Sequence, residues 1–175
     1  MAQPVLDRVA VAPVLSAVSV LPPVLSLREP VAAGIEHRPL TSTELLVAAA
    51  RADVIRLAFS PQVPGVAALA DLIAFAEQAI AAADRGRHEV RLLLDLDVVL
   101  AADVRTARRK RAELEYLDAL SGLTWSPADT RVVTTTEQLL TELAELAERT
   151  GVDGLVLHPL GGGERVEQEL RALIG

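Results

Sequence analysis

Short apolar segments alternate with helical segments from residue 31 to the end of the 175-residue chain, and this alternation constrains the fold more than any other feature. The apolar segments are mostly unbroken runs of Val, Leu and Ile, as in "RLLLDLDVVL", which is typical of strands buried on both faces. Between them, apolar side chains recur at spacings of three and four, which is typical of amphipathic helices. The alternation predicts an α/β fold with a parallel sheet.

Caps and turn residues set the expected boundaries. Thr41 and Ser42 are N-cap candidates with Glu44 in the first turn, while Gly86 and Gly151 are expected to follow helix ends. We expect strands at 31–35, 53–59, 89–100, 131–133 and 153–159, and helices at 41–52, 66–86, 103–120, 136–151 and 163–175.

Chain length bears on the architecture that the parallel sheet adopts. A complete eight-stranded (β/α) barrel needs about 200 to 250 residues, and this chain is shorter. We therefore predict a truncated or partial TIM-type (β/α) barrel of parallel strands over residues 31–175, in a single domain, with a small doubly wound sheet as the alternative. Residues 1–30 are rich in Val, Leu and Pro and predict an irregular segment with short strands at 9–12 and 14–20.

Composition excludes several classes of function. Aromatic residues make up only 2% of the chain, too few for base-stacking or carbohydrate platforms. The net charge of −7 repels nucleic acid, and the basic run at 105–111 is interpreted as a solvated helix face. The absence of cysteine fits a cytoplasmic location. We expect no metal site, no membrane span and no secretory signal.

Several stretches together are similar to a known family. "TTTE" at 134–137, "GVDGL" at 151–155 and the closing "VEQELRALIG" follow one another in the order typical of the carboxyl-terminal end of bacterial luciferase-like flavin-dependent oxidoreductases, of the nitrilotriacetate and alkanesulfonate monooxygenase kind. "LVAAARADVIRLAF" resembles the same family's helix-to-strand passage, and "VAAG" resembles the strand before its flavin-phosphate turn. The resemblance covers residues 31–175, the second half of that family's barrel.

This resemblance implies a flavin-dependent monooxygenase or oxidoreductase with FMN as cofactor, or a deazaflavin in its place. The family's first four βα units have no counterpart in residues 1–30. The resemblance therefore implies an incomplete active site without an assigned catalytic residue, and it leaves open a non-catalytic relative that binds no flavin and serves as a binding or assembly subunit.

The first candidate cofactor-binding group combines Gly34 with Thr41 and Ser42. A glycine after a strand lets backbone approach a phosphate, and hydroxyls at a helix start can donate to it. The resemblance implies the flavin phosphate here, while the alternative is a tight turn followed by a plain helix cap.

The second candidate group combines His158 with Gly161 and Gly162. His158 is expected near the carboxyl end of a strand, the edge at which (β/α) barrels place their sites, and the glycines precede a helix whose amides favour an anion. The alternative is a strand-end histidine with glycines that only reverse the chain.

Two further features carry weaker chemical hypotheses. Asp95 and Asp97 alternate onto one strand face and are candidates for acid–base work or for holding a cation. The alternative is that they line a polar barrel interior near a strand end or lie on an open edge. His37 and His88 have no spaced metal-binding partner, and Trp125 is interpreted as a core side chain rather than as part of a partner surface.

A partial barrel exposes strand edges and apolar interior, which rarely stay uncovered. We therefore expect a homodimer, or a partner subunit that completes the barrel, with residues 9–27 covering an edge or lying in the contact.

Overall fold

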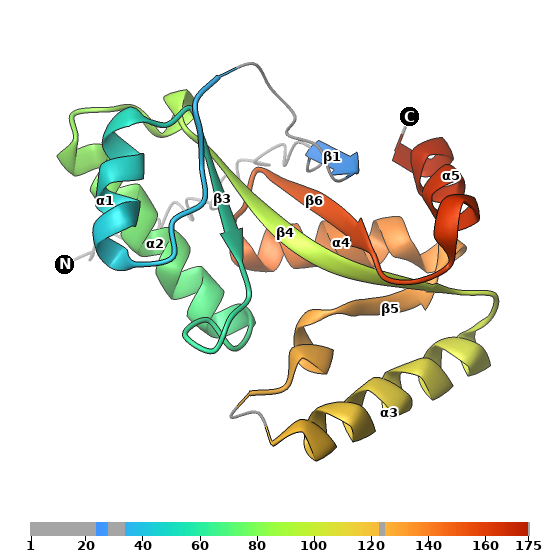
Figure 1. Cartoon of the computed structure of the whole chain (residues 1–175). Helices are drawn as coiled ribbons and strands as arrows, with labels where there is room; N and C mark the ends of the chain where they lie inside the picture. Colours follow the sequence, from blue (N-terminus) through green and yellow to red (C-terminus); the bar gives the residue numbers. More distant parts are fainter. Residues whose placement is uncertain (1–23, 28–33, 123–124, 175) are drawn as a thin grey trace, which may run out of the picture.

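The computed structural model describes residues 24–27, 34–122 and 125–174. Its centre is a six-stranded sheet in the order β1-β6-β4-β3-β2, with β5 also paired to β4, and every pairing is parallel (Figure 1). The strands are β1 (Val24–Leu27), β2 (Glu36–His37), β3 (Val54–Ala58), β4 (Arg91–Ala101), β5 (Val132–Thr135) and β6 (Gly154–Pro159). The prediction of a parallel α/β fold is confirmed.

Helices connect these strands. They are α1 (Ser42–Arg51), α2 (Val66–Ala82), α3 (Val104–Ser121), α4 (Thr136–Thr150) and α5 (Gly163–Ile174), with short 3-10 turns η1 (Arg87–Glu89) and η2 (Pro127–Thr130). N-cap side chains and glycines set the ends of these helices. The carboxylate of Asp103 accepts the Thr106 amide at the start of α3, and Gly122 and Gly151 end α3 and α4 in the left-handed conformation.

The long strand β4 organises the sheet. Its first half pairs with β3 (Val54↔Arg91 to Ala58↔Asp95) and its last residues pair with β5 (Val98↔Val132 to Ala101↔Thr135). On its other edge it pairs with β6. In Figure 1, β5 lies on the side of β4 where β3 lies, and β6 lies on the opposite side, so the strand order reverses at β4.

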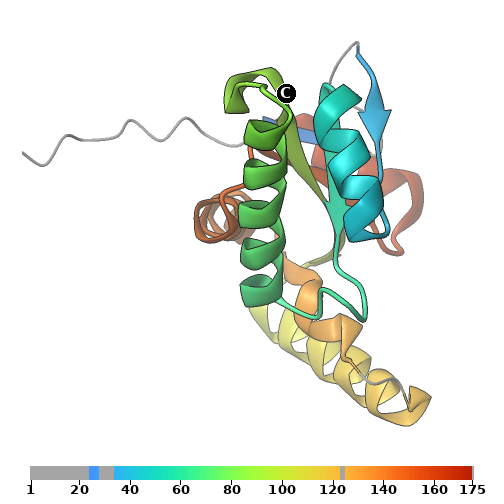
Figure 2. The same ribbon diagram turned by 90° about the vertical axis from the view of Figure 1, so that its left-hand side faces the viewer.

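Strand alternation divides β4 between two faces. The even-numbered residues from Leu92 to Leu100 join one large apolar core with side chains of α1, α2, α4 and α5, and this face is called the helix-covered face. Figure 2 shows α2 and α4 on one side of the sheet. The odd-numbered residues of β4 lie on the other face, called the site face.

Helix α3 differs from the other helices. Its Ala107 packs with Val99, Ala101 and Val133, which belong to the site face, so α3 lies on that side of the sheet. The reversal at β4 explains this placement. A right-handed crossover from β4 back toward the β3 side puts its helix on the opposite face from the helices of the other crossovers.

Several predicted boundaries were wrong. The strand expected at 31–35 is found at β2, after Gly34, although residues 31–33 lie outside the described residues. Helix α2 ends at Ala82 rather than near Gly86, since Asp84 adopts φ 58° and Gly86 instead precedes η1. The strands expected at 9–12 and 14–20 lie outside the described residues, and β1 was not predicted.

Candidate functional site

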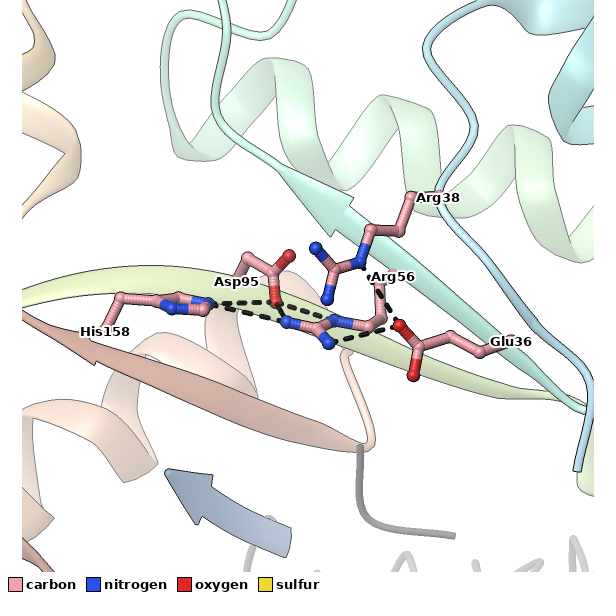
Figure 3. Close-up of polar contacts among 5 residues, drawn as sticks. All are labelled: Glu36, Arg38, Arg56, Asp95 and His158. Atoms are coloured by element: carbon pink, nitrogen blue, oxygen red, sulfur yellow. Dashed lines mark hydrogen bonds and ion pairs between the residues drawn. The ribbon is translucent and has the colours of Figure 1, made fainter. Parts of the chain in front are cut away.

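A buried arginine lies at the centre of a polar group on the site face (Figure 3). This group, called the interior cluster, joins side chains from neighbouring strands: Glu36 from β2, Arg38 just after it, Arg56 from β3, Asp95 from β4 and His158 from β6. The parallel register brings them together, since β3 and β6 flank β4 and place these side chains on the same face.

Arg56 makes most contacts of the cluster. Its Nε donates to Asp95 Oδ1 at 2.8 Å, and its Nη2 donates to the same oxygen. Its Nη1 donates to Glu36 Oε1 at 3.1 Å, an oxygen that also accepts from Arg38 Nε at 3.2 Å. The guanidinium is therefore held between carboxylates from two other strands.

His158 completes the cluster at the end nearest the carboxyl ends of the strands. Its Nε2 lies 3.4 Å from Asp95 Oδ1 and 3.4 Å from Arg56 Nη2. Its side chain is one-third exposed, whereas that of Arg56 is fully buried. His158 is thus accessible to a small molecule, and a carboxylate oxygen of Asp95 lies beside its Nε2 atom.

A pocket of about 300 Å³, called the interior pocket, opens beside His158. It is lined by Ala58, Phe59, Asp95, Asp97, Trp125, Pro127, Thr130, Arg131 and His158. Trp125 is half-buried there, so it forms part of a pocket wall. The lining combines two aromatic side chains with hydrogen-bond donors and acceptors, a composition typical of small-molecule sites.

Arg131 and Asp97 form a looser pair in the interior pocket. Arg131 Nε lies 3.6 Å from Asp97 Oδ2, beyond hydrogen-bond distance, and Nη1 lies 3.9 Å from Asp118 Oδ1. The Nε atom is buried, and no acceptor among the described residues forms a hydrogen bond with it. A buried donor without a partner costs free energy.

A larger pocket of about 740 Å³, called the rim pocket, lies at the carboxyl ends of β4 and β5. The starts of α3, α4 and α5 surround it, and Gly162 lies on its wall. Its ionisable lining residues are Asp103, Glu137, Arg165 and Glu169. Arg165 already pairs with Glu169 at 3.0 Å. The thirteen-residue lining is therefore acidic on balance.

Asp103 contributes a permanent negative charge at this pocket. The backbone N–H of Thr106, together with the Thr106 hydroxyl, holds the pKa of the Asp103 carboxyl below its ordinary value. The carboxylate therefore stays ionised throughout the neutral range.

The glycine triplet reverses the chain between β6 and α5. Gly161, Gly162 and Gly163 have φ values of 76°, 78° and 56°. A Cβ on Gly162 would lie 2.2 Å from Val166 Cγ2, so this position also requires the absence of a side chain. The triplet is thus explained by backbone geometry, and its role in cofactor binding stays a prediction.

The predicted site residues fall in different places. Gly34 precedes β2 and lies beside Asp53, at the amino edge of the sheet, away from the carboxyl edge where Gly162 lies. Thr41 caps α1 by accepting the Glu44 amide at 3.2 Å, and Ser42 is the first residue of the same helix. The structure therefore does not bring Gly34 together with Gly161 and Gly162.

Sequence reasoning identified Asp95 and His158 separately but missed Arg56, which joins them. The signal was present, since an arginine interrupts the apolar strand "VIRLA". A charged side chain in such a strand requires a buried partner, and Asp95 on the next strand is the partner.

His37 lies in β2 and His88 in an exposed turn. The described residues contain no group of three metal-ligating side chains.

Comparisons with known proteins identify the fold. No family model matches the sequence, and no curated protein matches it either. Among solved structures, EDTA monooxygenase (EmoA) from Chelativorans sp. BNC1 is 13% identical with a TM-score of 0.58, over 78% of this chain and 44% of that one. Riboflavin lyase (RcaE), solved with modified FMN and riboflavin, is 17% identical with a TM-score of 0.58, over 79% and 42%.

A deazaflavin enzyme has the same fold. An F420-dependent secondary alcohol dehydrogenase in complex with an F420-acetone adduct is 10% identical with a TM-score of 0.53, over 73% of this chain and 43% of that chain. The chain spans less than half the length of these three structures. No helix among the described residues is long and apolar enough to cross a membrane. The resemblance seen in the sequence is confirmed at the level of the fold, which is that of part of a luciferase-like (β/α) barrel.

Proposed function

We propose that this chain is a component of a luciferase-like, flavin-dependent oxidoreductase whose site is completed by a second copy or by a partner subunit. The observation that carries the proposal is the interior cluster. In a fold shared with flavin and deazaflavin enzymes, His158 lies next to a pocket with aromatic and hydrogen-bonding walls. We place the protein in the cytoplasm, because a chain without cysteine suits a reducing compartment.

The interior pocket fits the ring system of a flavin. Phe59 and Trp125 offer flat apolar surfaces, and Arg131 and His158 offer polar atoms for a ring edge. A bound reduced flavin would supply the electrons of the reaction. The protein would orient the ring, exclude water from it and exchange a proton at an imidazole nitrogen of His158, which lies 3.4 Å from a carboxylate oxygen of Asp95.

The rim pocket does not fit the phosphate of a flavin. Asp103, Glu137 and Glu169 place carboxylates around it, and its single arginine is already paired. Negative groups at such a site oppose the binding of a phosphate. The proposal therefore assigns the phosphate contacts to the subunit that completes the barrel, and FMN or a deazaflavin remains the cofactor class.

Titration with free flavins tests the proposal. Quenching of FMN or F420 fluorescence by the purified chain should saturate, and His158→Ala should weaken the binding by about tenfold or more, since it removes a polar contact worth about 1 to 2 kcal/mol. His88→Ala, an exposed histidine outside the pocket, is the matched control and should bind as the wild type does. Equal binding by both variants would place the flavin elsewhere.

A non-catalytic binding or assembly subunit is the second candidate. The acidic rim pocket favours it, and so does the way Arg56 already neutralises the carboxylates of the interior cluster. This candidate predicts no quenching by either flavin, even at millimolar concentration, while the chain remains folded by circular dichroism.

A further inference from the structure

Helix α3 carries far less buried surface than a helix of its length normally has. It spans 18 residues, and Ala107 is its only fully buried side chain. Leu114 adds a partly buried contact. Helices in proteins owe most of their stability to packing of an apolar face. The helix is about 27 Å long, and most of that length is exposed to solvent in the single chain.

The face of α3 opposite Ala107 has an unusual composition. Helical geometry places Arg105, Arg109, Ala112, Tyr116 and Leu120 along this face, and all of them are exposed. Tyr116 is 64% exposed and Leu120 is 66% exposed. This row of residues is called the outer stripe. It begins with cationic side chains and ends with large apolar ones.

Charges along α3 are arranged against the helix dipole. The first half carries Arg105, Arg108, Arg109, Lys110 and Arg111, and the second half carries Glu113, Glu115 and Asp118. Helix dipoles favour acidic residues near the start and basic residues near the end. Lys110 and Arg111 donate to the carbonyls of Leu100 and Val133 within the chain. The dipole does not favour the remaining arrangement, whereas a partner helix of opposite polarity would complement it.

An antiparallel copy of the same helix has that opposite polarity. When two outer stripes cross in antiparallel orientation, Arg105 meets Leu120 of the second copy, and Arg109 meets Tyr116. The crossing point then lies between residues 112 and 113, and the small side chain of Ala112 lets the helices approach. Each contact occurs twice, as a two-fold axis requires.

The contacts in this arrangement are chemically matched. The Arg109 guanidinium can stack on the Tyr116 ring of the second copy and lies within one turn of its Glu113, a cation–π contact beside an ion pair. The aliphatic stem of Arg105 covers the apolar side chain of Leu120. The basic half of each helix thus neutralises the acidic half of the other.

We propose that two copies of this chain associate through antiparallel pairing of their α3 outer stripes. The pairing does not depend on flavin binding. Since α3 lies on the site face of the sheet, a second copy held by α3 stands on the side of the molecule that carries His158. A single helix pair buries less area than a standard interface, so we expect a Kd of micromolar order.

Sedimentation velocity on the full chain tests the proposal. At roughly 100 μM the wild type should be mainly dimeric, given a Kd of micromolar order. Arg109→Glu should weaken the association at least tenfold. Arg165→Glu makes the same charge change on α5, where the side chain is 85% exposed, and should leave the dimer intact. Circular dichroism checks that both variants fold.

A mixing experiment identifies the surface itself. Arg109→Glu and Glu113→Arg should each weaken the homodimer by repulsion, and an equal mixture of the two variants should form a heterodimer because opposite charges meet again. A monomeric wild type at this concentration would overturn the proposal. So would a dimer that Arg109→Glu leaves unchanged, or a mixture that fails to associate.

Discussion

At the scale of single residues, Arg56 decides whether the interior cluster is stable. Its guanidinium is fully buried between Asp95 and Glu36, which keep only part of their carboxylates in solvent. Burying such charges is costly unless each one is paired. The cluster therefore stabilises the fold only as a complete set.

Replacing Arg56 should expose this dependence. Arg56→Met leaves two carboxylates on the site face without their counter-ion, and we expect a loss of about 3 to 5 kcal/mol in the free energy of unfolding. Urea denaturation measures the change. Arg38→Met removes a side chain that is 56% exposed and should cost no more than about 0.5 kcal/mol. Equal effects of the two variants would contradict the central role of Arg56.

The glycine triplet allows a matched comparison at the same scale. Gly161 and Gly162 have nearly equal φ values, so an alanine at either should cost about 1 to 2 kcal/mol in backbone strain. Only Gly162→Ala also drives a Cβ into Val166. It should therefore destabilise the protein more than Gly161→Ala, and adding Val166→Ala should recover part of the difference in thermal unfolding.

Single residues of the site were predictable where a polar side chain interrupts an apolar strand. Asp95, Asp97 and His158 stood out as polar side chains in apolar strands, and all three line one pocket. Arg131 was not singled out, because its place in the pocket depends on the turn between α3 and β5. Predicting the pairing of Arg56 with Asp95 would have required the register of β3 against β4, which cannot be inferred from the local sequence.

At the scale of elements, α3 depends on its N-cap more than the well-buried helices do. The Asp103 carboxylate accepts the Thr106 amide at 2.7 Å, and this contact lowers its pKa. A carboxyl with a depressed pKa stabilises the folded state above its unfolded pKa, and this stabilisation is lost as the pH falls through the folded value.

Substitution of the cap should therefore have a pH-dependent effect. Asp103→Ala should lower the Tm by about 2 to 4 °C at pH 7. The difference from wild type should shrink below about pH 4, the ordinary range of an aspartate, as the cap of the wild type becomes protonated. A difference that stays constant from pH 7 to pH 3 would show that the charge of Asp103 is not what stabilises the helix.

Helices and long strands were predicted better than short elements. Continuous periodicity marks α4 and the apolar run of β4, and both were placed to within about two residues. The strand β2 has only two residues and no periodicity to detect. The end of α2 was misplaced because Asp84, not a glycine, takes the left-handed conformation there.

At the scale of the whole molecule, net charge governs interactions with polyanions. The chain carries a formal charge of −7, and two of its basic residues at 105–111, Arg105 and Arg109, belong to the outer stripe proposed to pair with a second copy. We expect no retention on heparin or double-stranded DNA at physiological salt, because long-range repulsion dominates. Salt-dependent retention that Arg109→Glu abolishes would instead assign α3 to nucleic acid.

The overall architecture was predicted as a class, but the strand order was not. Alternating segments indicate parallel strands and crossover helices, yet the same alternation is compatible with β5 on either side of β4. The choice is made by the connection after α3 and by the packing of Ala107 against Val99 and Val133. Those contacts join residues far apart in the chain, and no local pattern encodes them.

The reversal at β4 governs how this sheet can be closed. Both edges of β4 are occupied, one by β3 and β5 and the other by β6, so among the described strands the main strand order ends at β1 and β2, while β5 pairs only with β4. In a (β/α) barrel the strands close around the face opposite most of the helices, so strands that joined these two ends would enclose the site face, where Arg56 and His158 lie. The same event that closes the sheet would then control the entry of small molecules to His158.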